Sequence, residues 1–262
     1  MNESLLKVTS LNKCFGGVEA AQDISVEVRQ GDFLGIIGPN GSGKTTLINL
    51  ITGFIKPDSG TIVYKGNNIT GLSPHKIANL GIARTFQMVK PFHGVPAFKN
   101  IIVPLCSPRV KGQKAEGRYG DRDSIAIDLL EEVGFERDSS VPYKPAETLP
   151  HGYLKRMELA RCLAMKPDLV ILDELFSGMS MAEVASVIPL IEKMQMQGWT
   201  IIMVEHRIKE LFRVANRIIV LNQGMKIAEG APREVVENEE VREAYLGRGP
   251  DTEGSGQSMS ST

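Results

Sequence analysis

The hydrophobic residues of the chain follow two different spacings, which predict strands and helices that alternate. Continuous apolar runs are typical of parallel strands buried on both faces, and they occur at 32–37, 168–174 and 200–204. Apolar residues at every second position in 5–11 and 24–28 instead predict half-buried antiparallel strands. Stripes at helical spacing predict helices, chiefly over 124–133, 153–165 and 181–197. The alternation predicts an α/β fold with a mostly parallel core sheet.

The pattern loosens between 88 and 122, where four prolines interrupt it and 107–122 is mostly polar and basic. We interpret this stretch as the entry into a second lobe. After 204 the pattern becomes regular again and predicts a hairpin, formed by 217–221 and 225–228, and two short helices. Residues 249–262 have almost no large apolar side chains, which predicts a disordered tail.

A glycine-rich stretch with a known spacing lies between a predicted buried strand and a predicted helix. Residues 38–45 read GPNGSGKT and fit the phosphate-loop pattern G-x-x-x-x-G-K-[ST]. Its glycines let successive backbone N–H groups converge on one anion at a helix N-terminus. Lys44 can then reach the β- and γ-phosphates, and the Thr45 hydroxyl can bind Mg²⁺. The expected nucleotide-binding residues are Gly38, Pro39, Asn40, Gly41, Ser42, Gly43, Lys44, Thr45 and Thr46.

Composition and charge argue against several other classes of protein. Thirty basic residues face 31 acidic ones, so no overall field attracts nucleic acid. The three cysteines are far apart, which argues against a zinc site. No apolar run approaches the ~18 residues that span a bilayer, and residues 1–11 lack the basic start of an export signal. We therefore expect a protein that is neither integral to a membrane nor exported.

Acidic and aromatic residues near the strand ends add candidate chemistry. Asp173 suits the shell of a magnesium ion, and Glu174 suits a general base for water. A strand end solvated by acids gives the same pattern, but the phosphate loop upstream favours an active site. For His206 the residue pattern leaves a catalytic and a structural role open. Phe15 either fills a core or stacks on an adenine.

These pieces, in this order from about residue 5 to 247, resemble the ATP-binding cassette (ABC) ATPases. The segments that carry the resemblance are LNKCFGG at 11–17, GIARTFQ at 81–87, VEH at 204–206 and VLNQGMKIAEG at 220–230. They look most like the LivG-type subunit of branched-chain amino acid importers. The resemblance implies a P-loop NTPase with an antiparallel β subdomain, a mostly parallel core sheet and a smaller helical subdomain.

The resemblance also implies a role for each matching residue. Phe15 stacks on adenine, and Gln87 links magnesium and the attacking water to the membrane partner. Asp173 belongs to the metal shell, Glu174 is the catalytic base and His206 senses the γ-phosphate. The implied catalytic residues are thus Glu174, His206 and Gln87, and the implied Mg²⁺ ligands are Thr45, Gln87 and Asp173.

The signature motif of the family acts on the site of the partner subunit, and here it departs from the usual pattern. It falls on Leu149, Pro150, His151, Gly152 and Tyr153. Tyr153 replaces the usual glutamine, and Pro150 has no hydroxyl to offer a phosphate. Leu175 replaces the proline that usually follows the catalytic glutamate. Ser180 stands where the partner-contacting loop usually carries Asp or Asn.

These departures suggest an asymmetric pair of sites. The site that uses Lys44 and Glu174 is competent if a partner supplies an intact signature, whereas the site that uses Pro150 to Tyr153 is impaired. Such asymmetry suits a heterodimer with a second ATPase subunit.

The domain boundaries that we expect follow from the order of the motifs. Residues 1–87 hold the antiparallel β subdomain and the first half of the nucleotide-binding core. Residues 88–160 form the helical subdomain with the signature, 161–247 complete the core, and 248–262 are the disordered tail. The apolar stretch 91–105, with Phe92, Phe98 and Ile101, either lines a groove for membrane helices or packs within the second lobe.

The implied function is ATP hydrolysis coupled to an importer for branched-chain or other amino acids. The expected cofactors are ATP and Mg²⁺. The expected partners are a second ABC ATPase subunit in a hetero- or homodimer, transmembrane permease subunits and, indirectly, a periplasmic or extracellular solute-binding protein, but no nucleic acid. The expected place is cytoplasmic, at the inner face of the cell membrane.

Two alternatives stay open. A degenerate cassette would bind nucleotide as a regulatory subunit with little hydrolysis, which the altered signature permits. A soluble ABC ATPase that acts on nucleic acid or ribosomes would be expected to carry tandem cassettes, coiled-coil insertions or zinc cysteines, and the sequence has none of them.

Overall fold

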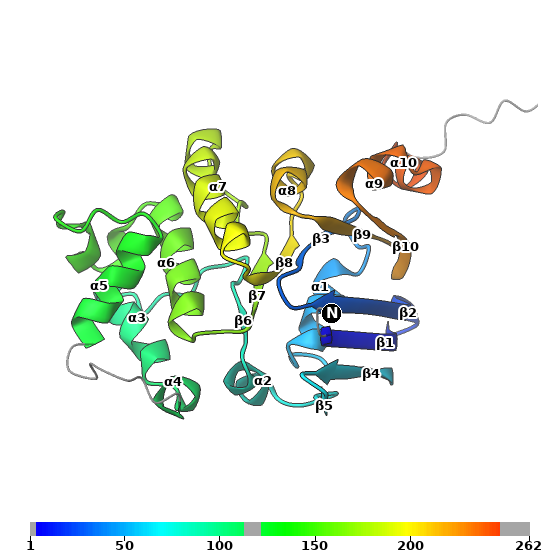
Figure 1. The fold of residues 1–262 in the computed structure, drawn as a ribbon, viewed down its shortest axis with the longest axis horizontal. Helices are drawn as coiled ribbons and strands as arrows, with labels where there is room; N and C mark the ends of the chain where they lie inside the picture. The colour runs from blue at the N-terminus through cyan, green and yellow to red at the C-terminus, as the bar shows by residue number, and fades with distance from the viewer. Residues whose placement is uncertain (1–3, 113–121, 247–262) are drawn as a thin grey trace, which may run out of the picture.

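The computed structural model describes residues 4–112 and 122–246, which form two sheets with helices around them (Figure 1). The first sheet has the strand order β2-β1-β4-β5 and is antiparallel. Its strands are β1 (Ser4–Phe15), β2 (Val18–Arg29), β4 (Ser59–Tyr64) and β5 (Asn67–Asn68). The two antiparallel strands predicted over 5–11 and 24–28 are confirmed, and both are longer than the sequence pattern indicates.

The second sheet has the order β10-β9-β3-β8-β7-β6. All neighbouring strands in it are parallel except β9 and β10, which form a hairpin. Its strands are β3 (Phe33–Ile37), β6 (Ile82–Arg84), β7 (Leu169–Asp173), β8 (Thr200–Val204), β9 (Arg217–Asn222) and β10 (Met225–Gly230). The predicted core sheet, mostly parallel and with a hairpin at one edge, is confirmed.

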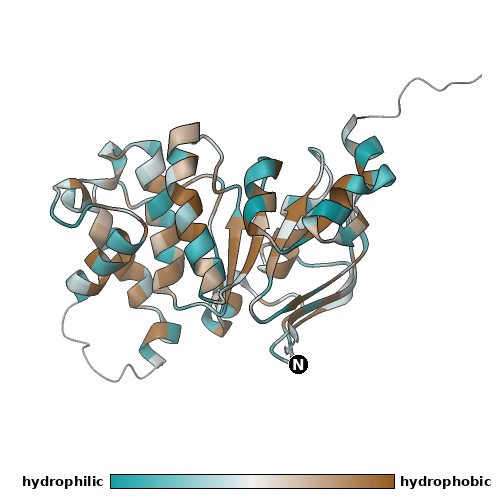
Figure 2. Ribbon diagram, turned by 45° about the horizontal axis from the view of Figure 1, so that its top comes forward, coloured by the Kyte–Doolittle hydropathy of each residue, from teal (hydrophilic) through white to brown (hydrophobic). Residues whose placement is uncertain are grey.

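Each face of the parallel sheet packs on a different hydrophobic core. The strands in the middle of Figure 2 are brown because their residues are hydrophobic. In β3, Phe33 and Ile37 belong to the core shared with the helices, whereas Leu34 and Ile36 belong to the core under the antiparallel sheet. Successive side chains of a strand point to opposite faces, so a strand covered on both faces is apolar at every position. This is why the central strands read as continuous apolar runs.

The helices fall into groups that follow the two cores. α1 (Lys44–Ile51) packs under the antiparallel sheet, while α3, α5 and α6 contact one another at the opposite end of the molecule (Figure 1). None of the helices in the described ranges is both long and apolar enough to cross a membrane. The other bounds are α2 (Pro74–Leu80), α3 (Ala97–Leu105), α4 (Pro108–Gly112), α5 (Arg122–Glu132), α6 (His151–Ala164), α7 (Met181–Met196), α8 (Ile208–Val214), α9 (Pro232–Glu237) and α10 (Glu239–Leu246), with 3₁₀ turns at Val141–Tyr143 and Ala146–Thr148.

The loosened sequence pattern at 88–122 contains a helix, α3, whose bounds the pattern did not predict. Pro96 is the N-cap of α3, and Pro104 lies in its last turn. Proline is tolerated at a helix start, and near the end it removes only one hydrogen bond. Ile101 is fully buried in the core that α3 shares with α5 and α6. Tertiary packing therefore forms a helix that the prolines disguise. The tail predicted at 248–262 lies outside the described residues.

Ser180 starts α7 with reciprocal hydrogen bonds. Its hydroxyl accepts a hydrogen bond from the Glu183 N–H at 3.3 Å, and the Glu183 carboxylate accepts one from the Ser180 N–H at 2.8 Å. This capping box satisfies two backbone donors that the helix leaves without partners. Ser180 therefore has a structural role in its own chain, whatever it contributes to a partner.

We expect Ser180→Ala to lower the free energy of unfolding by about 1 kcal/mol, because the Glu183 N–H loses its acceptor. Ser180→Asp keeps a good N-cap, so it should change stability by less than ~0.5 kcal/mol. Urea denaturation followed by circular dichroism measures both. Equal losses in the two variants would contradict the capping role.

Candidate active site

The phosphate loop connects the end of β3 to the start of α1, and its glycines fit where other residues would not. A Cβ atom at Gly38 would lie 2.2 Å from the carbonyl oxygen of Leu221. Gly43 has a φ of 99°, and a Cβ atom there would lie 2.5 Å from the carbonyl oxygen of Ala20. Both distances are far below van der Waals contact, so only glycine lets the loop pack against β2 and β9. The loop thus presents its backbone at the N-terminus of α1.

Lys44, the first residue of α1, is buried beside the loop. Its ammonium group donates hydrogen bonds to the carbonyl oxygens of Gly38 at 2.8 Å and Pro39 at 2.9 Å. Burial lowers the pKa of Lys44, and the nearby charges of Glu174 and Asp173 oppose this shift. The structure therefore brings the loop lysine into electrostatic contact with both predicted strand-end acids.

Parallel pairing of β7 and β8 places the predicted acids and histidine together. Asp173 is aligned with Val204, so the residues that follow each strand meet at the same edge of the sheet. Glu174 has a φ of 48°, which non-glycine residues rarely adopt, and its N–H donates to the Val204 carbonyl at 2.9 Å. This turn brings the Glu174 carboxylate to 3.0 Å from the Nε2 atom of His206. A Glu–His pair is thus part of the site.

A cavity of about 680 Å³ joins these pieces. The phosphate loop from Asn40 to Thr46 lines it, together with Glu174, His206 and the turn between β1 and β2. Phe15 lies at the end of β1 beside that turn, with 44% of its surface exposed. Asp173, which precedes Glu174 in the chain, is buried, and Arg84 holds one of its oxygens. The interpretation of Asp173 as a solvated strand-end acid is therefore excluded.

The sequence pattern at 82–87 predicts a strand that ends in Gln87. In the structure β6 ends at Arg84, so Gln87 lies beyond the strand. The residue is exposed, and its backbone carbonyl accepts a hydrogen bond from Lys155 at 2.8 Å. A side chain from α6 thus holds the backbone of Gln87 in place.

The signature residues lie at the start of α6, against the segment that leads into α7. Pro150 is the N-cap of α6. A Cβ atom at Gly152 would lie 2.4 Å from a carboxylate oxygen of Glu183. Tyr153 packs its ring 4.9 Å from that of Phe135, with its hydroxyl 3.4 Å from the Glu136 carboxylate. Tyr153 is therefore turned toward the helical end of its own chain.

The sequence pattern did not single out Lys155, although it is the most thoroughly buried cation near the site. Its ammonium group donates to the backbone carbonyls of Gln87 at 2.8 Å and Glu174 at 3.3 Å. Burial lowers its pKa, while the charges of Glu205 and other acids oppose the shift. A lysine within the apolar stripe of a helix was the only signal that could have identified it. It ties α6 to both segments that the sequence assigned to catalysis.

Glu205 was also missed. It follows β8, is buried, and accepts a hydrogen bond from the Phe176 N–H at 2.8 Å. Burial raises its pKa from 4.5 to about 7, with the Glu174 charge adding to the shift. A carboxyl group here holds the backbone of the segment that follows Glu174.

Comparison with known proteins gives these features a family. A model of the family described as ABC transporter matches residues 21–177, more than half of the chain. The chain belongs to the ABC transporter family. A second model, described as branched-chain amino acid ATP-binding cassette transporter, matches residues 225–251 of this ABC protein.

Curated relatives share nearly the whole length of the cassette. The high-affinity branched-chain amino acid transport ATP-binding protein LivG of Salmonella typhimurium is 34% identical over 256 residues, covering 94% of this chain and 99% of that protein. The corresponding protein BraF of Pseudomonas aeruginosa has the same identity and coverage. Among solved structures, the ADP conformation of MJ1267, an ATP-binding cassette of an ABC transporter, is 30% identical and has a TM-score of 0.80, covering 94% of this chain and 99% of that one.

The predictions of an ABC fold, of nucleotide binding and of a transport ATPase are thereby confirmed. The roles of the individual site residues and the domain boundaries stay predictions, because similarity of sequence or of structure over the whole chain does not test them one by one.

Glu205 should make the stability of this ABC cassette depend on pH. Its folded pKa lies above its ordinary value, so between pH 4.5 and about 7 the folded chain keeps a proton that the unfolded chain releases. Stability from this group therefore falls as the pH rises through that window. Glu205→Gln keeps an acceptor for Phe176 but cannot ionise.

Between about pH 5 and about pH 8, the wild type should lose about 2–3 kcal/mol of unfolding free energy that Glu205→Gln does not lose. The difference in stability between the variant and the wild type should therefore shift by this amount in favour of the variant. Denaturant melts at the two pH values measure the difference. A wild type and variant whose stabilities change in parallel with pH would show that Glu205 titrates normally.

Proposed function

We propose that this ABC subunit hydrolyses Mg·ATP at the cleft around Lys44 and Glu174 to energise the import of branched-chain or other amino acids. The observation that carries the proposal is the single cavity shared by the phosphate loop and the Glu174–His206 pair. The amino-acid class rests on the names of the relatives and on the match at 225–251. The solute itself would be selected by other subunits.

The residues at the cleft fit a magnesium ion that is shared with phosphate. Within the described ranges, no three or more His, Cys, Asp or Glu side chains are clustered to hold a metal by themselves. Mg²⁺ in nucleotide sites usually takes one or two protein oxygens and completes its shell with phosphates and water. Thr45 lines the cavity and Asp173 directly precedes Glu174, which also lines it, so both could supply hard oxygen donors. Bound Mg²⁺ would offset phosphate charge, with Gln87 as the third predicted ligand.

The chemistry that we assign to the chain's own groups follows from their environment. Lys44 and the loop N–H groups bind and neutralise the phosphates. The Glu174 carboxylate, beside the cavity, orients a water molecule and accepts its proton. His206 donates from Nε2 to Glu174 and can thereby hold that carboxylate toward the γ-phosphate. Phe15, exposed at the end of β1, would stack on the adenine.

A second ABC subunit completes this scheme. The resemblance implies that the signature at Leu149–Tyr153 acts on another subunit's phosphates, and here it lies at the start of α6 beside the segment before α7. The Tyr153 ring is packed against Phe135, and Pro150 offers no hydroxyl, so the signature side of this chain has fewer polar groups than the family pattern. We propose a heterodimer in which the site built on Lys44 and Glu174 is the more active one.

Glu174→Gln should lower ATP hydrolysis by about 100-fold or more while ATP binding is retained, because the general base is lost but the phosphate cradle is not. Lys44→Ala should weaken ATP binding itself. Both are measured on the complete transporter with a phosphate-release assay and a fluorescent ATP analogue. Wild-type turnover in Glu174→Gln would instead favour the regulatory alternative.

The asymmetry has its own test. The equivalent change to Gln in the second cassette should reduce hydrolysis much less than Glu174→Gln does. Equal losses from the two changes would overturn it.

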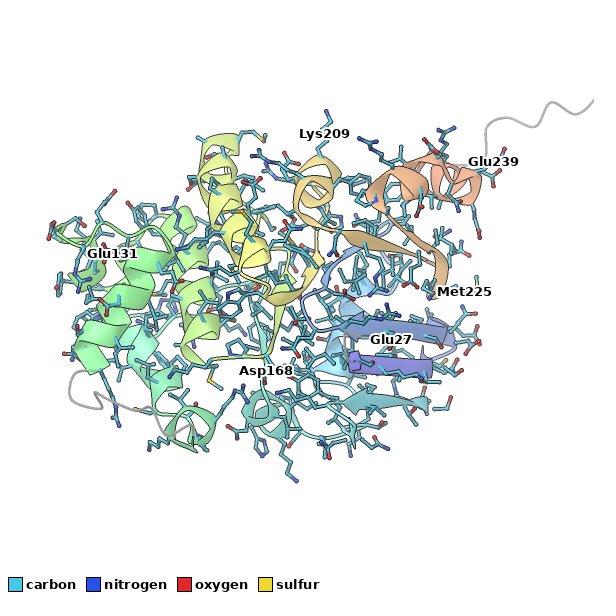
Figure 3. All side chains as sticks on the ribbon, viewed as in Figure 1. Glu27, Glu131, Asp168, Lys209, Met225 and Glu239 are labelled. Carbon is cyan, nitrogen blue, oxygen red and sulfur yellow. The ribbon has the colours of Figure 1, made fainter. Side chains whose placement is uncertain are left out.

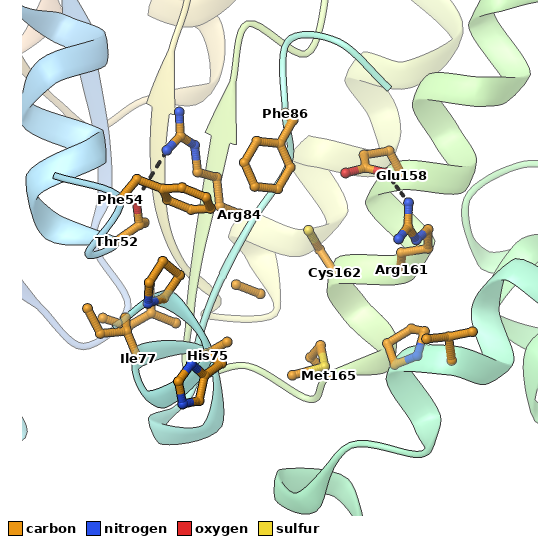
Figure 4. A pocket seen from close by; sticks show the side chains of 16 residues that line it. Thr52, Phe54, His75, Ile77, Arg84, Phe86, Glu158, Arg161, Cys162 and Met165 are labelled. Atoms are coloured by element: carbon orange, nitrogen blue, oxygen red, sulfur yellow. Dashed lines mark hydrogen bonds and ion pairs between the residues drawn. The ribbon is translucent and has the colours of Figure 1, made fainter. Parts of the chain in front are cut away.

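Permease subunits would need a binding surface on this chain, and an apolar groove of about 340 Å³ is a candidate (Figure 4). We call it the docking groove; its lining includes Phe54, Ile77, Phe86, Val103, Cys162 and Met165. Phe54 and Val103 expose about half of their surface, 53% and 52%. Large apolar side chains gathered on an open surface are typical of a binding site. We propose that a cytoplasmic helix of a permease subunit occupies it, which places the chain at the inner face of the membrane.

The apolar stretch 91–105 is divided between the helical core and the groove. Ile101 is wholly buried in the helical core, and Phe98 packs against Tyr143 with 5.4 Å between ring centroids. Val103 and Pro104 instead line the docking groove. Alternate faces of α3 thus serve the core and the proposed interface.

Val103→Asp should greatly reduce the amount of permease subunits that co-purify with the chain, because it puts a charge into the apolar groove. Val236→Asp is the matched control, since Val236 is 50% exposed on α9. Affinity purification of the tagged chain from detergent-solubilised membranes measures the permease that is retained. Equal recovery with both variants would rule out the groove as the docking surface.

A further inference from the structure

Arg84 forms an ion pair with Asp173, the acid that we assign to the metal shell. It is the last residue of β6, and only 7% of its side chain is exposed. Its Nη2 atom lies 2.6 Å from Oδ2 of Asp173. Its Nη1 atom donates to Oδ1 of Asn49 at 2.7 Å and to the Thr52 hydroxyl at 3.1 Å. One guanidinium group therefore joins the end of β6, the end of β7 and the helix that begins at the phosphate loop.

The same guanidinium group forms part of the wall of the docking groove. Its carbon lies 5.7 Å from the ring centroid of Phe54 and 5.1 Å from that of Phe86. The two rings meet edge to face with 5.6 Å between centroids, and Figure 4 shows Arg84 beside them. Both rings are exposed in the groove, where a permease segment would touch them. Any movement of these rings changes the surroundings of the cation that holds Asp173.

The details of the contact suggest more than structural support. A buried carboxylate needs a partner, and a planar guanidinium fixes its orientation better than an ammonium group does. The ion pair uses Oδ2, so Asp173 has a second oxygen for the metal shell. In the described part of the chain, the Nε atom of Arg84 is buried with no hydrogen-bond partner. The cation is thus held by its two terminal nitrogens and the aromatic rings, an arrangement that can shift when the rings shift.

We propose that Arg84 is a positioning residue that orients Asp173 for Mg·ATP and transmits occupancy of the docking groove to the magnesium site. The proposal rests on the proposed function, because it assumes that Asp173 serves the metal shell. It adds a physical connection between the permease surface and the nucleotide that does not pass through Gln87.

The test measures ATP binding to the purified chain with a fluorescent ATP analogue, in excess Mg²⁺ and in excess EDTA. The readout is the factor by which Mg²⁺ tightens binding. Arg84→Met should reduce this factor by about 10- to 100-fold, the usual effect of losing a residue that orients a metal ligand. Binding in EDTA should stay within about two-fold, since the phosphate loop is unchanged. Arg84→Lys keeps the charge without the planar fork, so it should give an intermediate loss.

A matched control lies at the other end of β7. Arg109 pairs with Asp168 at 2.7 Å, just before the strand begins, at the position labelled in Figure 3. Arg109→Met also removes an Arg–Asp pair, next to the start of this strand, but it should leave the Mg²⁺ factor unchanged. Thermal melts of all variants report folding, and Arg84→Lys serves if Arg84→Met does not fold.

Two outcomes would overturn the proposal. One is an equal loss of binding with and without Mg²⁺ in Arg84→Met or Arg84→Lys, which a purely structural ion pair predicts. The other is an undiminished effect of Arg84→Met in an Asp173→Asn background, since the two changes should not add if Arg84 acts through Asp173. If Asp173→Asn by itself leaves the Mg²⁺ factor unchanged, the assignment of Asp173 in the proposed function fails instead.

Discussion

β3, β8 and β7 pair in parallel and are covered on both faces, so their carboxyl ends must meet at one edge of the sheet. Everything that we assign to catalysis lies at that edge or on the turns that leave it. The phosphate loop follows β3, Asp173 ends β7 with Glu174 directly after it, and Glu205 with His206 follows β8. Strand order thus converts three distant stretches of sequence into one site, as is usual for open parallel sheets. A shift in the β7–β8 register would separate Glu174 from His206.

The edge concentrates buried charge, and each charge there is compensated by a neighbour. Arg84 faces Asp173, Lys155 bridges two backbone carbonyls, and Glu205 holds a backbone N–H. Desolvated charges are costly unless they are paired or hydrogen-bonded, so such an arrangement tolerates few conformations. The network therefore ties together β6, β7, α6 and the segments that follow β7 and β8. It is connected outward through Arg84 to the docking groove and through Lys155 to α6.

α6 connects the predicted signature to the predicted catalytic residues of the same chain. Its first turn carries the predicted signature residues, while Lys155 one turn later donates to the backbone carbonyls of Gln87 and Glu174. A tilt of α6 would move the residues at both places, because a helix moves as a rigid element. Pro150 and Tyr153, where the motif departs from the family pattern, lie at the N-terminal end of α6. Lys155 follows them and is buried, with hydrogen bonds to the carbonyls of Gln87 and Glu174.

The sequence by itself determined the phosphate loop, the parallel sheet, the strand-end acids and the family, because each depends on short spacings or on the apolar pattern of a single element. It also placed the hairpin at β9 and β10 and the antiparallel strands. Only the tertiary structure revealed α3, whose prolines disguise a helix stabilised by packing on α5 and α6. Only the structure, likewise, gave roles to Arg84, Lys155 and Glu205. Their partners lie 19 to 89 residues away in the chain, and no local pattern can show which buried charge will meet which.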